Sequence, residues 1–136
     1  HQKEHGFHPR IMITREKARV RRLIFTSVGI ESSVKSEFRV YNLEEMSFVD
    51  QVALFSNAKE IIAVHGAGLS NIVFCSKKTL VIELCPENLK SDFFANISEV
   101  IGLRYKRIFC SVISQNDDIE MSSKLIKKIN AVRKSC

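Results

Sequence analysis

The chain has 136 residues, 45% of them hydrophobic, and a formal net charge of +6. This length and apolar content predict one domain with a real core over residues 1–136. No apolar run approaches the roughly 18 residues of a membrane span, and the first residues lack the apolar segment of a signal peptide. We therefore expect no transmembrane segment in this chain. Because the chain does not begin with Met, we expect a fragment of a longer protein.

Four cysteines are widely spaced and form no Cys-x-x-Cys pair. This pattern favours free thiols in a reducing compartment, and it argues against a zinc site. The sequence also lacks an Asp-x-Asp metal motif, and the pair Asp117-Asp118 is better explained as a helix cap. We therefore expect no obligatory metal and no cofactor.

Apolar patterns of strand and helix type alternate along the chain. They predict strands over residues 10–14, 38–41, 60–64, 80–84 and 105–112. They predict helices over residues 23–35, 48–57, 68–75 and 91–101, and a final helix capped by Asp117 or Asp118. Ser47 begins a capping box for the second of these helices, and Ser91 is the expected cap of the fourth. Such alternation indicates an α/β, Rossmann-like fold, in which helices cover both faces of a mainly parallel sheet.

Residues 61–71 are the most informative segment of the sequence. An apolar run typical of a buried parallel strand stops at His65-Gly66-Ala67-Gly68, and the next apolar residues have helical spacing. Glycines at a strand-to-helix turn allow close approach of the backbone, and the N–H groups of the new helix favour an anion such as phosphate. A plain tight turn explains the pattern about equally well, because Asn71 replaces the third glycine of the dinucleotide fingerprint.

Two further groups are expected near this turn. The loop from Arg15 to Arg22 follows the first strand, and Glu83 ends the fourth, so both lie at the carboxyl edge where parallel sheets bind ligands. Basic residues favour phosphates, although a solvated loop is the simpler alternative. Glu83 stands about where an acidic residue reaches a ribose hydroxyl, or it faces water at the strand end. Together these groups predict a site for a nucleotide or a phosphorylated ligand.

Longer motifs extend this interpretation. They are the run Ser47-Phe48-x-x-Gln51-x-x-Leu54-Phe55-x-x-Ala58, the block His65-Gly66-Ala67-Gly68-Leu69-Ser70-Asn71-Ile72-Val73-Phe74, and Val81-Ile82-Glu83. With Arg15, Arg19 and Arg22, they make residues 10 to 108 similar to the family sixty-one glycosyltransferases. That family includes plant xylosyltransferases, extracellular O-GlcNAc transferases and bacterial capsular-polysaccharide enzymes. Leu23-Ile24-Phe25-Thr26 departs from it, since the family usually continues with a polar Asn-Glu there.

The resemblance implies the C-terminal, donor-binding half of a two-domain GT-B enzyme. Such an enzyme is an inverting glycosyltransferase that moves a sugar from a nucleotide-sugar donor to a glycan or polysaccharide acceptor. The acceptor-binding N-terminal half, where the general base would usually lie, is then missing, and the isolated chain is expected to be inactive. We expect a cytoplasmic location, including a membrane surface, or the Golgi or ER lumen if the source is eukaryotic.

The resemblance also implies roles for single residues. Arg15 and Arg19 would neutralise the donor diphosphate, with N–H groups from Gly66, Ala67 and Gly68. His65 could donate to a phosphate or a sugar hydroxyl, act as a base, or be structural. Glu83 would reach the ribose. The supporting residues are Ser47 as a cap, Gln51 on a polar helix face, and Asn71, which orients the turn.

Two other classes of function stay open at this point. A non-catalytic nucleotide- or phosphate-binding module fits the short chain. An NAD-dependent oxidoreductase domain is weakened, because the glycine turn follows the third expected strand instead of the first. Nucleic-acid binding draws only on net charge, since no aromatic residues interleave with the basic run.

Overall fold

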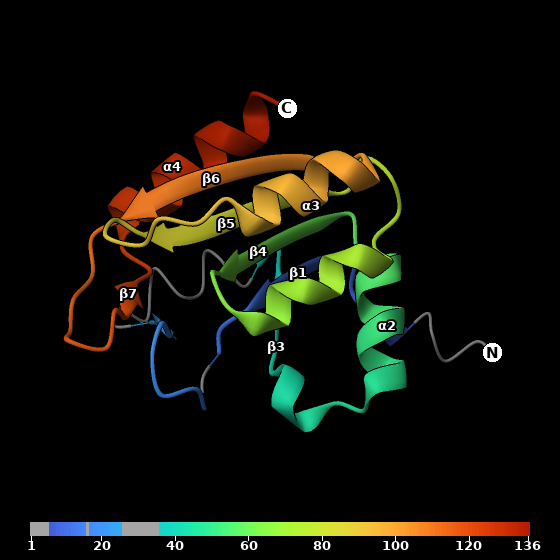
Figure 1. Cartoon of the computed structure of the whole chain (residues 1–136), viewed down its shortest axis with the longest axis horizontal. Coiled ribbons are helices and arrows are strands. Elements are labelled where there is room, and N and C mark those ends of the chain that lie inside the picture. Colours follow the sequence, from blue (N-terminus) through green and yellow to red (C-terminus); the bar gives the residue numbers. More distant parts are fainter. Residues whose placement is uncertain (1–5, 16, 26–35) are drawn as a thin grey trace.

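Five parallel strands form the central sheet of the computed structural model, which describes residues 6–15, 17–25 and 36–136 (Figure 1). The strand order is β3-β1-β4-β5-β6. The strands are β1 (Arg10–Ile13), β3 (Arg39–Tyr41), β4 (Glu60–Val64), β5 (Leu80–Pro86) and β6 (Arg104–Cys110). A separate two-stranded parallel sheet pairs β2 (Leu23–Ile24) with β7 (Ile119–Glu120). The expected α/β, Rossmann-like fold is confirmed.

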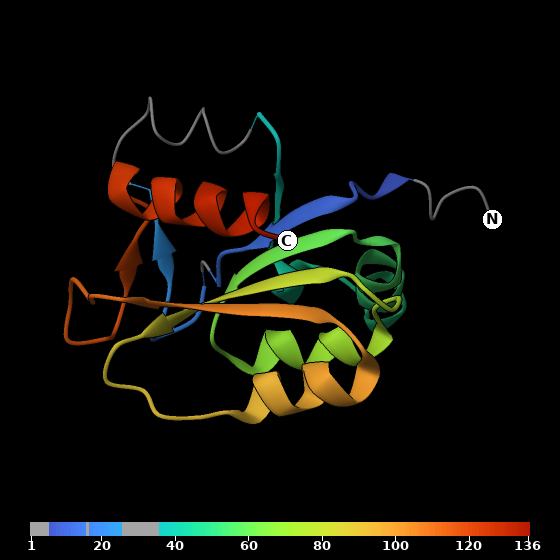
Figure 2. The ribbon, with the colours of Figure 1, turned by 90° about the horizontal axis from the view of Figure 1, so that it is seen from above.

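Helices cover both faces of this sheet. The α-helices are α2 (Phe48–Asn57), α3 (Phe93–Ile101) and α4 (Ser123–Lys134), and the 3-10 helices are η2 (Leu43–Glu45) and η3 (Ala67–Phe74). Figure 2 shows α4 on one face and η3 with α3 on the other. Among the described residues, no helix is both long and apolar enough to span a bilayer.

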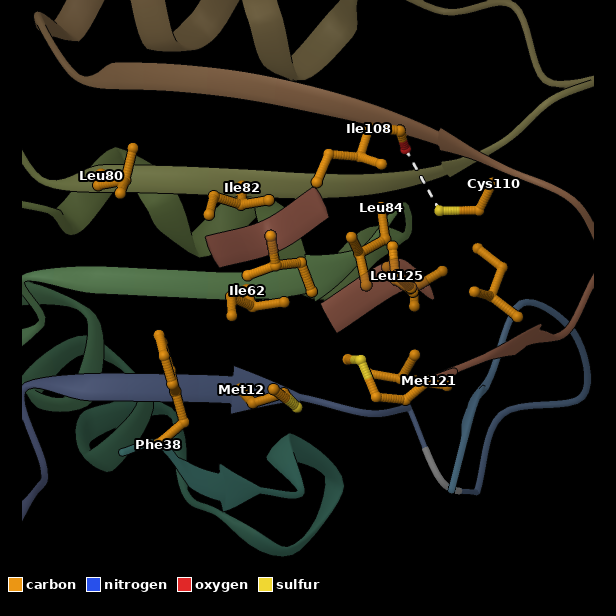
Figure 3. Close-up of a cluster of buried hydrophobic side chains, with 14 residues drawn as sticks. Met12, Phe38, Ile62, Leu80, Ile82, Leu84, Ile108, Cys110, Met121 and Leu125 are labelled. Carbon is orange, nitrogen blue, oxygen red and sulfur yellow. Dashed lines mark hydrogen bonds between the residues drawn. The ribbon is translucent and has the colours of Figure 1, made fainter. Parts of the chain in front are cut away.

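The core consists of two apolar clusters, one on each face of the sheet. Alternate residues of a strand point to opposite faces, so Leu80, Ile82 and Leu84 of β5 pack in the cluster that includes α4 (Figure 3). Val81 belongs to the opposite cluster, beneath α2 and η3. Every residue of β5 is buried, as its apolar run predicts for a strand covered on both faces. Glu83 is the charged exception within it.

The first expected helix, over residues 23–35, is contradicted in its described part. Leu23 and Ile24 form β2, and residues 26–35 lie outside the described residues. Leu23 is buried with α4 in the core, and its strand pairs with residues about 96 positions away. Pairing with the distant strand β7 thus determines the extended conformation of Leu23 and Ile24, which the local sequence pattern does not predict.

Several expected ends also differ. The fourth expected helix begins at Phe93 with Asp92 as its N-cap, while the Ser91 hydroxyl accepts from the backbone N–H of Phe93. The last strand ends at Cys110 instead of 112. The last helix is capped by Ser122, whose side chain accepts from the N–H of Leu125.

Candidate functional site

The glycine turn lies at the carboxyl end of β4. Gly66 precedes η3, which starts without a side-chain cap, so its first N–H groups are open to an anion. Gly66 has a φ of 167°, an extended conformation open to any residue. Its need for glycine is steric, because a Cβ there would overlap the guanidinium of Arg15. At Gly68 a Cβ would meet Cδ1 of Leu43 at 2.9 Å, the movable end of a side chain.

The basic loop folds back onto this turn. Arg15 donates through Nε to the carbonyl of Arg21 at 3.0 Å and through Nη2 to that of Val20 at 3.3 Å. Arg21 donates through Nε to the carbonyl of His65 at 3.3 Å. Burial, and next the charge of Arg21, lower the pKa of Arg15. Two arginines therefore gather at the turn, while Arg19 is exposed and its side chain makes no hydrogen bond among the described residues.

Backbone strain marks the same loop. Arg15 and Arg21 have φ angles of 59° and 56°, in the left-handed region that residues other than glycine rarely adopt. The loop is fixed by a neighbouring anchor, in which Asp118 accepts from Nε of Arg22 at 3.2 Å and from its Nη2 at 2.9 Å. The side-chain hydrogen bond from Arg22 lowers the pKa of Asp118 to about 2. Asp118 thus anchors the loop and does not cap the last helix. The N-cap of that helix is Ser122.

A cavity of about 200 Å³ opens between this loop and the turn. Its lining includes Arg15 and Gly68, together with Ile13, Ala18, Asn42, Leu43 and Glu44. The volume is below the roughly 300 Å³ at which small-molecule pockets begin. A whole nucleotide would therefore extend beyond this cavity.

A cluster of polar side chains from neighbouring strands lies next to the turn. Glu83 is fully buried, and its Oε2 lies 2.5 Å from Nδ1 of His65. Its Oε1 accepts a hydrogen bond from the hydroxyl of Tyr105. Arg107 donates from Nε to the Tyr105 hydroxyl at 3.0 Å, and the same nitrogen lies 3.8 Å from Oε1 of Glu83. Burial, followed by the hydrogen bond to Glu83, raises the pKa of Tyr105.

These contacts exclude the water-facing alternative for Glu83. It lies within β5, which continues to Pro86, and it does not face water. Both carboxylate oxygens have partners within the protein, so a ribose contact would require one of these hydrogen bonds to break. Tyr105 and Arg107 are functional candidates that the sequence interpretation missed. Their alternate positions on β6 place both on the face that Glu83 shares, which the two-residue period of a strand could have indicated.

The supporting residues form a chain of hydrogen bonds. The Ser47 hydroxyl caps α2 by accepting from the N–H of Asp50 at 3.1 Å. The Gln51 amide donates to the carbonyl of Leu43 at 3.0 Å and accepts from Nδ2 of Asn71 at 2.9 Å. Gln51 therefore ties η2, α2 and η3 together, a larger role than that of a polar surface residue. This hydrogen bond connects Asn71, in the helix after the turn, to α2.

One group among the described residues has the donor atoms of a metal site. Ligand atoms of His65, Glu83 and Cys85 lie within 4.8 Å of one another. Burial raises the pKa of the Cys85 thiol, and this disfavours the thiolate that metal binding requires. The short hydrogen bond between His65 and Glu83 already occupies two of the three donor groups.

A larger cavity of about 530 Å³ lies beyond the carboxyl ends of β5 and β6. Arg107 and Phe109 line it, with Glu87, Leu89, Lys90, Ser91 and Asp92. Arg107 reaches Asp92 at 3.2 Å and lies over the half-exposed Phe109 ring at 5.5 Å from its centroid. This hollow extends the same carboxyl edge that carries the glycine turn.

A parallel sheet covered on both faces, with a basic loop and a glycine turn at its carboxyl edge, defines a Rossmann-like domain. The profile of the glycosyltransferase 61 family matches residues 2–82, more than half of the chain. The chain belongs to the glycosyltransferase 61 family, and the resemblance noted in the sequence is confirmed.

Relatives from animals and a plant support this assignment. The chain is 32% identical over 77 residues to protein O-linked-mannose beta-1,4-N-acetylglucosaminyltransferase 2 of Canis lupus familiaris, covering 54% of this chain and 13% of that protein. It is 31% identical over 93 residues to beta-1,2-xylosyltransferase of Arabidopsis thaliana, covering 68% of this chain and 16% of that protein. The chain therefore matches only a small part of the length of these curated relatives.

Proposed function

We propose that this chain forms the donor-binding part of an inverting glycosyltransferase of the GT-B type, which transfers a sugar from a nucleotide-sugar to a glycan acceptor. One observation carries the proposal: Arg15 and Gly68, at the uncapped start of η3, line a small cavity at the carboxyl edge of the sheet, and Arg21 contacts the same turn through the carbonyl of His65. Membership of the glycosyltransferase 61 family supports the class of reaction.

In this proposal the diphosphate of the donor lies in this cavity. Negative charge builds on the diphosphate as it leaves the sugar, and guanidinium groups and backbone N–H groups stabilise that charge. Arg15 is held against Gly66, and the N–H groups of Ala67 and Gly68 begin η3. Arg19, exposed on the same loop, reaches the outer phosphate or the sugar. Guanidinium groups then supply the positive charge that a metal ion supplies in other transferases.

The rest of the reaction needs a second domain. Transfer requires a base near the acceptor hydroxyl and a wall that excludes water from the donor. We assign both to an N-terminal acceptor-binding domain, and we expect no turnover from the 136-residue chain by itself. The relatives are named for transfer of N-acetylglucosamine to protein O-linked mannose and of xylose. We accordingly propose that the donor carries one of these two sugars. Because both relatives are eukaryotic, we propose the Golgi or ER lumen as the location, in place of the reducing compartment that the cysteine spacing favoured.

Calorimetry with uridine diphosphate tests donor binding. We expect a dissociation constant on the order of micromolar to millimolar that weakens as salt rises, because the contact is mainly ionic. Arg15→Ala should weaken binding by at least about tenfold, since a charged hydrogen bond contributes roughly 1.5–3 kcal/mol. Lys127→Ala on α4 removes the same charge from an exposed position and is the matched control. Tight, salt-insensitive binding of NAD would refute the proposal.

Activity separates an enzyme from a binding module. A longer protein that carries the upstream domain should transfer sugar in an end-point assay, and the short chain should not. Donor binding without transfer by the longer protein would favour the non-catalytic module. Turnover by the short chain that disappears on His65→Ala would disprove the need for a second domain and make His65 catalytic.

A further inference from the structure

The His65 ring is held in place by contacts on one side of the turn. Its Nδ1 lies 2.5 Å from Oε2 of Glu83, and the edge of Phe94 packs on it with ring centroids 5.0 Å apart. Its backbone N–H donates to the carbonyl of Leu84 at 3.0 Å. Only 14% of the side chain is exposed, and Nε2 has no hydrogen-bond partner among the described residues. One ring nitrogen is thus fixed, and the other is left for a ligand.

We propose that Glu83, Tyr105 and Arg107 act together as positioning residues that hold His65 as the Nδ1–H tautomer. Nε2 then carries a lone pair, which accepts a hydrogen bond from a hydroxyl group of the bound nucleotide-sugar. This ligand assignment rests on the proposed donor site, whereas the tautomer does not depend on it.

The direction of each hydrogen bond follows from the chemistry of the donors. A guanidinium can only donate, so the Tyr105 oxygen accepts from Arg107 at 3.0 Å. The hydroxyl hydrogen of Tyr105 is then directed to Oε1 of Glu83. Because Arg107 also lies 3.8 Å from that oxygen, Glu83 is an ionised acceptor. Its Oε2 must therefore accept as well, and the proton of the short contact belongs to Nδ1 of His65.

In the neutral ring, this tautomer excludes one role that the sequence left open for His65, donation to a phosphate through Nε2, and it keeps the roles of acceptor and base. With its hydrogen on Nδ1, a neutral imidazole offers no N–H to a phosphate oxygen from Nε2. It offers a lone pair, which fits a ribose or sugar hydroxyl. Glu83 thus contributes to ligand recognition through His65, although both of its own oxygens are buried.

Long-range proton–nitrogen NMR spectra of the full chain test the tautomer directly. His65 should show a protonated Nδ1 and an unprotonated Nε2, with its signals assigned from a His65→Asn variant. Glu83→Gln should increase the Nε2–H form, because the amide removes the charge that holds the Nδ1 proton. Tyr105→Phe, a milder change, should shift the equilibrium in the same direction and serves if the first variant does not fold. Glu60→Gln is the matched control, since Glu60 also pairs with arginines but lies away from His65.

A second measurement tests the ligand. His65→Gln should weaken binding of uridine diphosphate N-acetylglucosamine by roughly three- to tenfold, the effect of one neutral hydrogen bond, and leave inorganic pyrophosphate binding unchanged. An Nε2–H tautomer in the wild-type protein would overturn the inference, even if donor binding persisted. Stoichiometric Zn²⁺ binding that is lost on Cys85→Ser would also overturn it. The expected tautomer in a chain that binds no nucleotide would refute the proposed function and leave the positioning role intact.

Discussion

Replacing Asp118 by Asn tests whether the basic loop depends on a residue far away in the sequence. The Asp118 carboxylate accepts from the backbone N–H of Arg22 at 2.9 Å, twice from its guanidinium, and from the Ser114 hydroxyl at 3.0 Å. Asparagine keeps the size of the side chain and one acceptor oxygen. It loses the charge and one of the two guanidinium contacts, so the ionic part of the anchor is removed selectively.

The lowered pKa of Asp118 gives the scale of the effect. The pKa falls from 3.8 to about 2, chiefly through the side-chain hydrogen bond from Arg22, and one pKa unit corresponds to about 1.4 kcal/mol, so the scale is about 2.5 kcal/mol. The Arg22 side chain is 35% exposed, and water and salt weaken such pairs. We therefore expect Asp118→Asn to lower the free energy of unfolding by about 1 to 2 kcal/mol at neutral pH.

Acidity should erase this difference. Because the pKa of Asp118 is lower in the folded state, its stabilisation is complete above about pH 4 and disappears as the pH falls toward 2. Urea unfolding at pH 7, 5 and 3 measures the difference in the free energy of unfolding between wild type and variant. This difference should be smallest at pH 3. The variant should also bind uridine diphosphate less tightly, because its loop is less fixed.

Asp117→Asn is the matched control. Asp117 has a φ of 60°, which asparagine tolerates, and its side chain makes no hydrogen bond among the described residues. An equal loss of stability in both variants would refute the claim that the Asp118 carboxylate anchors the loop. A loss for Asp118→Asn that stays constant with pH would refute it as well.

Three further predictions concern the turn, a helix end and the core. Gly66→Ala should displace Arg15, which should weaken uridine diphosphate binding about tenfold in calorimetry and lower the free energy of unfolding in urea by about 1 kcal/mol. Gly6→Ala is the control, because a Cβ there meets open space and should change neither quantity. Gly102→Ala should lower the free energy of unfolding by about 1 kcal/mol, because the residue ends α3 with a φ of 91°; an unchanged urea midpoint would contradict this. Leu84→Ala should lower it by about 2–5 kcal/mol, since the side chain is fully buried in the α4 cluster, and a loss below about 1 kcal/mol would show that the site collapses around the gap.

Local signals in the sequence were sufficient for much of the fold. The apolar runs of β4 and β5 and the capping box at Ser47 depend on neighbours in the chain, and all three were predicted correctly. The position of Arg15 at the glycine turn followed from the rule that parallel strands share one carboxyl edge.

The missed features depend on distant partners. Leu23 is a strand residue only because Ile119 lies beside it, and Asp118 is an anchor only because Arg22 reaches it. For Glu83 the sequence left two interpretations open, a contact with a ribose hydroxyl or a strand-end carboxylate that faces water, and neither includes the hydrogen bonds that the structure shows. The hydrogen-bond partners of Glu83 are His65, directly after β4, and Tyr105 of β6, and the spacing of residues within β5 does not indicate either of them.

The pairing of β2 with β7 has a consequence for where this domain ends. The family profile stops at residue 82, and the last strand of the main sheet stops at Cys110. A chain shortened at either point would lose β7, α4 and Asp118, all of which lie beyond Cys110. Leu23 would then lack its apolar cover, and the arginines at the glycine turn would lose their anchor. The smallest unit that keeps both the cover of Leu23 and the anchor of the basic loop is therefore larger than the stretch by which its family is recognised.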